Sequence, residues 1–138
     1  MIHAGVSELR QVFHAHLQVA HGCNGFSYHL LLFYAVECGL KGIWLTRQNL
    51  QRTDQIGDDT LLSQDGHNLL RWIKELRLPA RLAGSPPHFR LASGGAHWDI
   101  GNAHQAWRYG TRMHNGDEQA LVAWLYSLCT WVREEMRR

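Results

Sequence analysis

Residues 26–45 read FSYHLLLFYAVECGLKGIWL, and this stretch decides the fold. Its apolar side chains fall on almost every side of a helix, and a helix of that kind is normally buried by its neighbours. At roughly 1.5 Å per residue it would be about 30 Å long. Gly39 and Gly42 lower the helix propensity of its interior, which suggests that a neighbouring element approaches closely there. The stretch therefore predicts the central helix of a bundle.

Apolar residues at helical spacing predict further helices on both sides of this one. We expect Ser7 or a neighbour to cap the first and Asn102 to cap a short one that Gly110 stops. Pro79 should end the helix before it. The predicted helices cover residues 6–21, 67–76, 102–109 and 117–136.

Two segments lack a helical pattern. Residues 46–64 are polar and predict a loop, with one helical turn around residues 48–52. Residues 84–100 contain Gly84-Ser85-Pro86-Pro87 and Ser93-Gly94-Gly95, which predict an irregular or hairpin insertion. The connections at 22–25 and 115–116 are short and favour antiparallel neighbours. We therefore predict a single domain over residues 1–138, an all-α, antiparallel bundle of four to five helices with one insertion.

Composition narrows the class of protein. The chain is 45% hydrophobic and 19% charged, which argues against a disordered segment or a membrane protein. A formal net charge of +2 permits contact with nucleic acid without requiring it. The three cysteines show no metal-binding spacing and suit a reducing compartment. We expect a cytoplasmic protein without a signal peptide, metal or cofactor.

Glu37 and Lys41 stand four residues apart in the otherwise apolar central helix. On an exposed edge they would form a simple ion pair. In a buried position they would need further polar partners. The second alternative predicts a polar site inside the bundle.

The stretch Trp107-Arg108-Tyr109-Gly110-Thr111-Arg112-Met113-His114 combines an arginine and a histidine with five residues between them. Histidine can move a proton to or from a ribose hydroxyl, and arginine can bind a phosphate at two points. A break at Gly110 would let Arg108 and His114 approach one another. Arg90 and His97 have similar spacing. The alternative is that Arg108 ties down one end of the bundle and His114 is a solvated turn residue.

Three segments resemble HEPN domains, a family of helical ribonucleases and nucleotide-binding proteins. Residues 28–41, with Glu37-Cys38-Gly39-Leu40-Lys41, resemble the second helix of that family. Asp65-Gly66-His67-Asn68-Leu69 resembles the start of a later helix. Trp107-Arg108-Tyr109 resembles the aromatic-Arg-Tyr segment near the site where active members carry arginine and histidine. The matches occur in the family's order.

The resemblance implies an antiparallel helical bundle, often a homodimer, in which arginine and histidine cut RNA without metal. It would make Arg108 the phosphate-binding residue and His114 the acid–base group. Glu37 would orient Arg108, with Lys41 and Tyr109 supporting the site. His67 would be structural, bonded to a loop carbonyl. RNA or ligand contacts are expected from Arg112, Trp107 and His104, and base stacking from Trp98 or Trp107.

Three functions remain open. The first is a HEPN-like endoribonuclease of a toxin–antitoxin or antiviral-defence system, with a partner such as a nucleotidyltransferase antitoxin. The second is a non-catalytic nucleotide-binding, RNA-binding or protein-interaction module of a defence or CRISPR-type assembly. Tyr109 favours this alternative, because active members commonly have a polar Asn, Asp, His or Gln directly after the arginine. The third is a helical adaptor with no role in nucleic-acid binding.

Overall fold

The computed structural model describes residues 2–58, 61, 67–84 and 86–138. Within them the chain is mostly helical and contains no strand, which confirms the all-α class. None of the described helices is both long enough and apolar enough to span a bilayer. The α-helices are α1 (Val6–Ala20), α2 (Phe26–Arg47), α3 (Leu69–Leu76), α4 (Ala80–Ala83), α5 (Ala103–Arg108) and α6 (Asn115–Met136).

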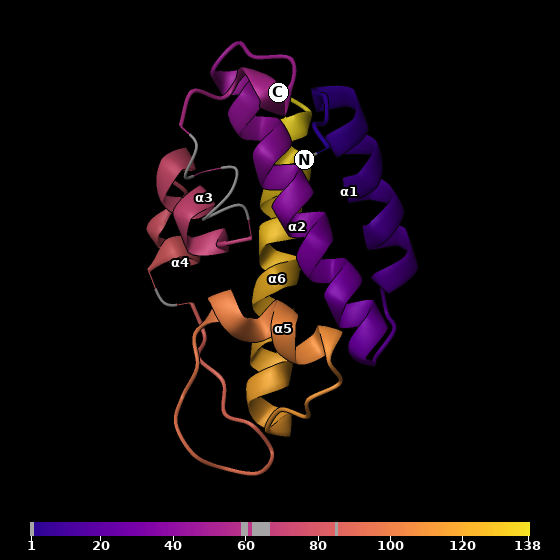
Figure 1. Cartoon of the computed structure of the whole chain (residues 1–138), viewed down its shortest axis with the longest axis vertical. Helices are drawn as coiled ribbons and strands as arrows, with labels where there is room; N and C mark the ends of the chain where they lie inside the picture. The colour runs from indigo at the N-terminus through magenta and orange to yellow at the C-terminus, as the bar shows by residue number, and fades with distance from the viewer. Residues whose placement is uncertain (1, 59–60, 62–66, 85) are drawn as a thin grey trace.

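Helix α2 lies at the centre of the bundle, as its sequence predicts (Figure 1). Helices α1, α3, α5 and α6 all pack against it. Phe33, Val36 and Leu40 are completely buried, and burial of each such side chain contributes about 1.5–3 kcal/mol. Gly39 lies where Phe13 of α1 and Val132 of α6 leave no space for a side chain. The packing of α2 therefore positions the other long helices.

The long helices are not uniformly antiparallel, which corrects that part of the prediction. Helix α1 runs antiparallel to α2, as the short turn at residues 22–25 predicts. Helix α6 instead runs in the same direction as α2. His29 near the start of α2 faces Glu118 near the start of α6, and Arg47 at the end of α2 contacts Glu135 near the end of α6. The segments between α2 and α6 are long enough to return the chain to the lower end of the bundle in Figure 1.

Several helix ends follow from local hydrogen bonds. Gly5, not Ser7, precedes α1, and its backbone N–H donates to the Glu8 carboxylate at 3.0 Å. Helix α5 ends before Gly110, whose φ of +68° suits glycine, as predicted. The His114 side chain caps α6 by accepting a hydrogen bond from a backbone N–H of its first turn. These ends place α5 across the lower part of the bundle (Figure 1).

The segment between α3 and α5 confirms the insertion only in part. Phe89 and Trp98 form an isolated antiparallel bridge with two backbone hydrogen bonds of 2.9 and 2.7 Å. Leu91 pairs with Met113 rather than with the other arm of a hairpin. The turn predicted at residues 48–52 occurs later, as a 3-10 turn over Thr53–Gln55.

Candidate functional site

The two residues expected to act together, Arg108 and His114, have different partners. Arg108 is exposed at the end of α5, and its Nη2 donates to the Tyr34 hydroxyl at 3.1 Å. His114 lies at the start of α6, 3.4 Å from the Asp117 carboxylate and beside Arg90. No contact joins Arg108 to His114 in the described part of the chain. The break at Gly110 therefore separates them rather than bringing them together.

Arg108 belongs instead to a polar cluster on α2, α5 and the turn before α3. Two contacts of the Glu37 carboxylate organise it: His67 Nδ1 lies 2.6 Å from Oε1, and Lys41 Nζ lies 3.0 Å from Oε2. The His67 ring also lies 5.3 Å from the His104 ring, between ring centroids. We call this group the Glu37 cluster; it consists of Tyr34, Glu37, Lys41, His67, His104 and Arg108.

Tyr34 links the two groups of the cluster that could touch a ligand. Its ring lies 6.2 Å from the His67 ring, and its hydroxyl accepts the hydrogen bond from Arg108. Tyr34 stands one helical turn before Glu37 on α2, so both side chains project from the same region of that helix. The central helix therefore positions a histidine and an arginine that are 41 residues apart in sequence.

The protonation of Glu37 follows from its surroundings. Burial alone would raise its pKa, but the hydrogen bond from His67 and the charge of Lys41 together outweigh burial, so its pKa is lowered. Glu37 is therefore ionised at neutral pH. Burial lowers the pKa of His104, and the charges of His67 and Arg108 lower it further. His104 is therefore uncharged at neutral pH.

Exposure distinguishes the two histidines. The His67 side chain is 55% exposed, although the Glu37 side chain that it contacts is only 8% exposed. Nδ1 of His67 is directed at Glu37, and Nε2 contacts no hydrogen-bonding group in the part of the chain that the structure describes, so it can face a ligand. His104 is buried, and its Nδ1 has no hydrogen-bond partner among the described residues. A buried carboxylate that orients an exposed imidazole is the arrangement needed for general acid–base chemistry.

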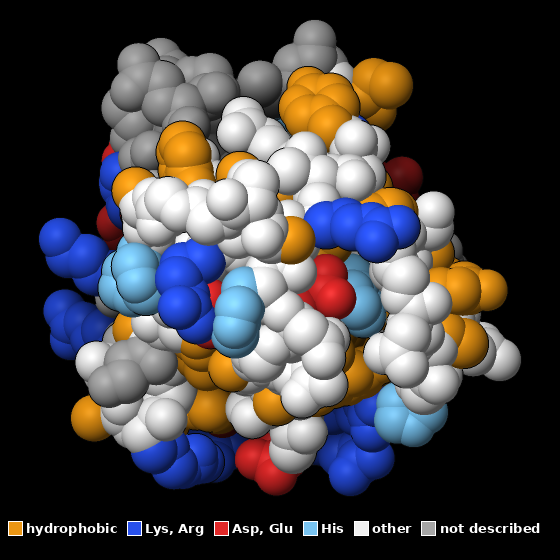
Figure 2. Space-filling model, turned by 90° about the horizontal axis from the view of Figure 1, so that it is seen from below, with side chains coloured by type: hydrophobic (Ala, Val, Ile, Leu, Met, Phe, Trp, Pro, Cys, Tyr) orange, Lys and Arg blue, Asp and Glu red, His pale blue; other side chains and the backbone are white. Residues whose placement is uncertain are grey.

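A second polar group surrounds Asp117 at the start of α6. The Arg90 backbone N–H and Nε donate to Asp117 Oδ2 at 2.9 and 3.0 Å. These bonds lower the Asp117 pKa to about 2. Arg90 belongs to the insertion and Asp117 to the first turn of α6, so this ion pair ties the insertion to α6. Figure 2 shows histidine and acidic side chains interspersed with basic ones on the face seen from below.

Some of the remaining residues that were expected to contact or support a ligand are buried, and others are exposed. Trp107 is 1% exposed, and its Nε1 donates to Glu118 at 3.0 Å, so it is a core residue rather than a stacking platform. His104 is buried too, which corrects its expected contact with RNA. Tyr109 and Arg112 are exposed. Of the residues expected to contact RNA or a ligand, Arg112 and Trp98 are therefore accessible, Trp98 at 45% exposure.

Two expectations about the supporting residues were wrong. Glu37 contacts His67 and Lys41, while Arg108 contacts Tyr34, so Glu37 does not bond to the arginine directly. His67 bonds to a carboxylate rather than to a loop carbonyl. Sequence reasoning did not assign His67 a chemical role, although it lies in a segment that resembles HEPN domains. Asp65 and Gly66 of that segment lie outside the described residues.

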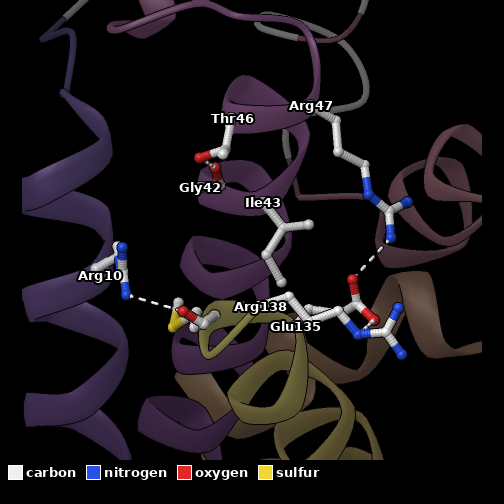
Figure 3. Close-up of a pocket in the computed structure, with 8 residues that line it drawn as sticks. Arg10, Gly42, Ile43, Thr46, Arg47, Glu135 and Arg138 are labelled. Carbon is white, nitrogen blue, oxygen red and sulfur yellow. Dashed lines mark hydrogen bonds and ion pairs between the residues drawn. The ribbon is translucent and has the colours of Figure 1, made fainter.

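A groove at the opposite end of the bundle is rich in arginine but is not the better site. It has a volume of about 230 Å³ between α1, α2 and α6 (Figure 3). Arg10 donates to the Met136 carbonyl, and Arg47 donates to the Leu76 carbonyl and to Glu135. These arginines satisfy groups of the protein itself at helix ends. We therefore assign this groove a structural role.

No family model, curated protein or solved structure matches the chain. The described residues also contain no group of three or more His, Cys, Asp or Glu side chains arranged to hold a metal ion. The functional argument consequently rests on the Glu37 cluster and on the sequence resemblance.

Proposed function

We propose that this protein is a HEPN-like endoribonuclease that cleaves RNA through attack of the 2′-hydroxyl. The observation that supports it best is the 2.6 Å contact between Glu37 and the exposed His67, which Tyr34 connects to Arg108. In this proposal His67 is the acid–base group and Arg108 binds the scissile phosphate. His114, which the sequence favoured, caps α6 instead.

The reaction needs two proton transfers. His67 Nε2 takes the proton of the 2′-hydroxyl, and Glu37 stabilises the resulting imidazolium. The 2′-oxygen bonds to phosphorus, the bond from phosphorus to the 5′-oxygen breaks, and the 5′-oxygen receives a proton. The products are a 2′,3′-cyclic phosphate and a 5′-hydroxyl. Arg108 offsets the charge that develops on the phosphate oxygens.

One protomer presents a single accessible histidine in this cluster, because His104 is buried. We assign the second proton to His67 of another copy of the chain, in the homodimer that the resemblance implies. The toxin–antitoxin or antiviral setting, with an antitoxin as partner, belongs to the same proposal. Toxicity on expression that His67→Ala relieves would support that setting.

The alternative is a non-catalytic module that binds RNA or a nucleotide. The same observation favours it: if no second histidine joins the site, His67 and Arg108 can bind a phosphate without completing the reaction. Such a protein would retain RNA binding but leave the RNA intact.

The test is cleavage of single-stranded RNA by purified protein in EDTA. We expect His67→Ala to lower the rate about 10²–10⁴-fold and Arg108→Ala about 10²–10³-fold. His114→Ala is the matched histidine control and should cleave at nearly the wild-type rate once its folding is verified by circular dichroism.

Two results would decide against this assignment. Loss of cleavage in His114→Ala with full activity in His67→Ala would return the acid–base role to His114. Intact RNA after incubation with folded wild-type protein would leave the non-catalytic module as the better description.

A further inference from the structure

A shallow groove between the insertion and α5 carries two exposed aromatic side chains. Trp98 is 45% exposed and Tyr109 is 72% exposed. Both line the same groove, whose floor includes the buried ring of Phe89. Neither exposed ring packs against another aromatic ring of the described chain. Their exposed surfaces are therefore accessible to a planar ligand.

The size and edges of the groove restrict that ligand. Its volume is about 160 Å³, below the roughly 300–1,000 Å³ of sites that enclose a whole small molecule. The amide side chains of Asn102 and Gln105 line it as well. Each amide offers both hydrogen-bond donors and an acceptor. One flat ring system with polar edges fits this combination.

The charge of the surrounding segment favours a ligand attached to phosphate. Residues 86–114 contain three basic residues and one acidic residue, and the ion pair with Asp117 compensates one of the basic residues, Arg90. One of the basic residues, Arg108, directly precedes Tyr109 in the chain. The three are Arg90, Arg108 and Arg112, and the acidic residue is Asp99.

We infer that this groove binds an unpaired base of single-stranded RNA by stacking on Trp98 and Tyr109. The inference deepens the proposed function and rests on it for the choice of RNA. Base–aromatic stacking is tolerant of sequence, and the amides of Asn102 and Gln105 add hydrogen bonds to the base edge. Tyr109 of the groove directly follows Arg108 of the Glu37 cluster in the chain, so a base stacked in the groove would belong to a nucleotide near that cluster.

The groove is suited to mutagenesis because its backbone does not depend on the Trp98 side chain. The bridge between Trp98 and Phe89 consists of main-chain hydrogen bonds, which an alanine retains. Tyr109 is mostly exposed, so its removal leaves little unfilled space. Trp98→Ala and Tyr109→Ala should therefore fold, as circular dichroism and thermal unfolding can verify.

The experiment measures binding separately from cleavage. Fluorescence anisotropy of a labelled single-stranded RNA is recorded with the His67→Ala protein, to which each groove substitution is added. Stacking contributes about 1–3 kcal/mol per base, so Trp98→Ala or Tyr109→Ala should raise the Kd about 5- to 150-fold. Trp98→Phe should retain most of the affinity. Tyr28→Ala, which removes an exposed aromatic side chain outside the groove, should bind like its parent.

Different results would overturn this inference and the proposed function. Unchanged Kd values for Trp98→Ala and Tyr109→Ala would overturn the groove, even if wild-type protein cleaves RNA. Equal losses for single-stranded RNA and for the matching duplex would also overturn it, because duplex bases are not free to stack. If wild-type protein cleaves nothing, but the two substitutions weaken binding and Tyr28→Ala does not, the groove is supported and only the catalytic proposal fails.

Discussion

Nδ1 of His67 lies 2.6 Å from Oε1 of Glu37, so an exposed turn is bonded to a carboxylate buried in the central helix. The partners are 30 residues apart. Glu37 also bonds to Lys41, which leaves its charge compensated from both sides. A buried charge is tolerated only with such partners. The same contact therefore both connects α2 to the turn before α3 and orients the exposed histidine.

Glu37→Gln should weaken both functions of this contact. The amide keeps the shape of the side chain but removes the charge that His67 and Lys41 face. We expect the free energy of unfolding to fall by about 1–3 kcal/mol, the cost of poorly satisfied buried polar groups. RNA cleavage should fall as well, because the imidazole loses the group that orients it. Urea unfolding and the EDTA cleavage assay measure the two effects.

Glu134→Gln is the control for loss of a carboxylate. Glu134 is exposed on α6, so this change should alter stability by less than about 0.5 kcal/mol. A Glu37→Gln protein with the stability and the cleavage rate of the wild type would remove Glu37 from the site.

The stability of the protein should decrease on mild acidification. Burial is the main cause that lowers the pKa of His29 and of His104, although Glu118 acts in the opposite direction on His29. A histidine with a lowered folded-state pKa binds its proton more weakly in the folded than in the unfolded state. Its contribution to the free energy of unfolding is complete above the ordinary histidine pKa of about 6.5. That contribution is lost as the pH falls through the lowered pKa of the folded state. Thermal unfolding between pH 8 and pH 5 should therefore show a falling Tm below about pH 6.5.

Substitution of the buried histidines tests the origin of that slope. A His29→Leu, His104→Leu double variant should show a flatter Tm profile between pH 6.5 and pH 5, whatever its absolute stability. His97→Leu, on the exposed insertion, is the matched control and should keep the wild-type slope. The same slope in the double variant and the wild type would assign the effect to other groups.

The sequence predicted the parts of the fold that depend on local patterns. The apolar stretch of α2 and the stripe of α6 indicated two long helices because periodicity along one segment reports its own burial. The direction of α6 relative to α2 was not predictable in that way. It depends on the path that the chain takes between the two helices, and the periodicity within one helix does not report that path.

The site was predictable in its residue types and not in their pairing. Glu37 and Lys41 were identified because a charged pair in an apolar helix needs partners. Their partner His67 comes from a turn far along the chain, and one sequence does not report such contacts. Spacing favoured His114 as the partner of Arg108, but the turn at Gly110 directs His114 to Asp117. Trp107 and Trp98 look alike in sequence, and only tertiary packing separates the buried ring from the exposed one.

The three thiols should differ in reactivity. Burial is the main cause that raises the pKa of Cys38 to about 11 and of Cys129 to about 12. Both are therefore protonated at pH 8, and the thiolate is the reactive form. Cys23, partly exposed in the turn after α1, should be modified first. Mass spectrometry after brief treatment with iodoacetamide should find one adduct in native protein and three after unfolding in urea. Rapid labelling of Cys129 in native protein would contradict this packing.

Gly39 and Gly42 provide the last prediction, because the same substitution should have opposite effects at two sites one turn apart. A Cβ atom on Gly39 would lie 2.7 Å from Val132 and 3.0 Å from Phe13. Overpacking of this kind typically costs about 1–3 kcal/mol, so Gly39→Ala should lower the free energy of unfolding. A Cβ atom on Gly42 would meet Leu9 at an ordinary 3.6 Å, and alanine improves helix propensity by about 1 kcal/mol. Gly42→Ala should therefore stabilise the protein. Urea unfolding of both variants measures the two signs, and stabilisation by Gly39→Ala would show that α1 and α6 do not pack against α2 as closely as described.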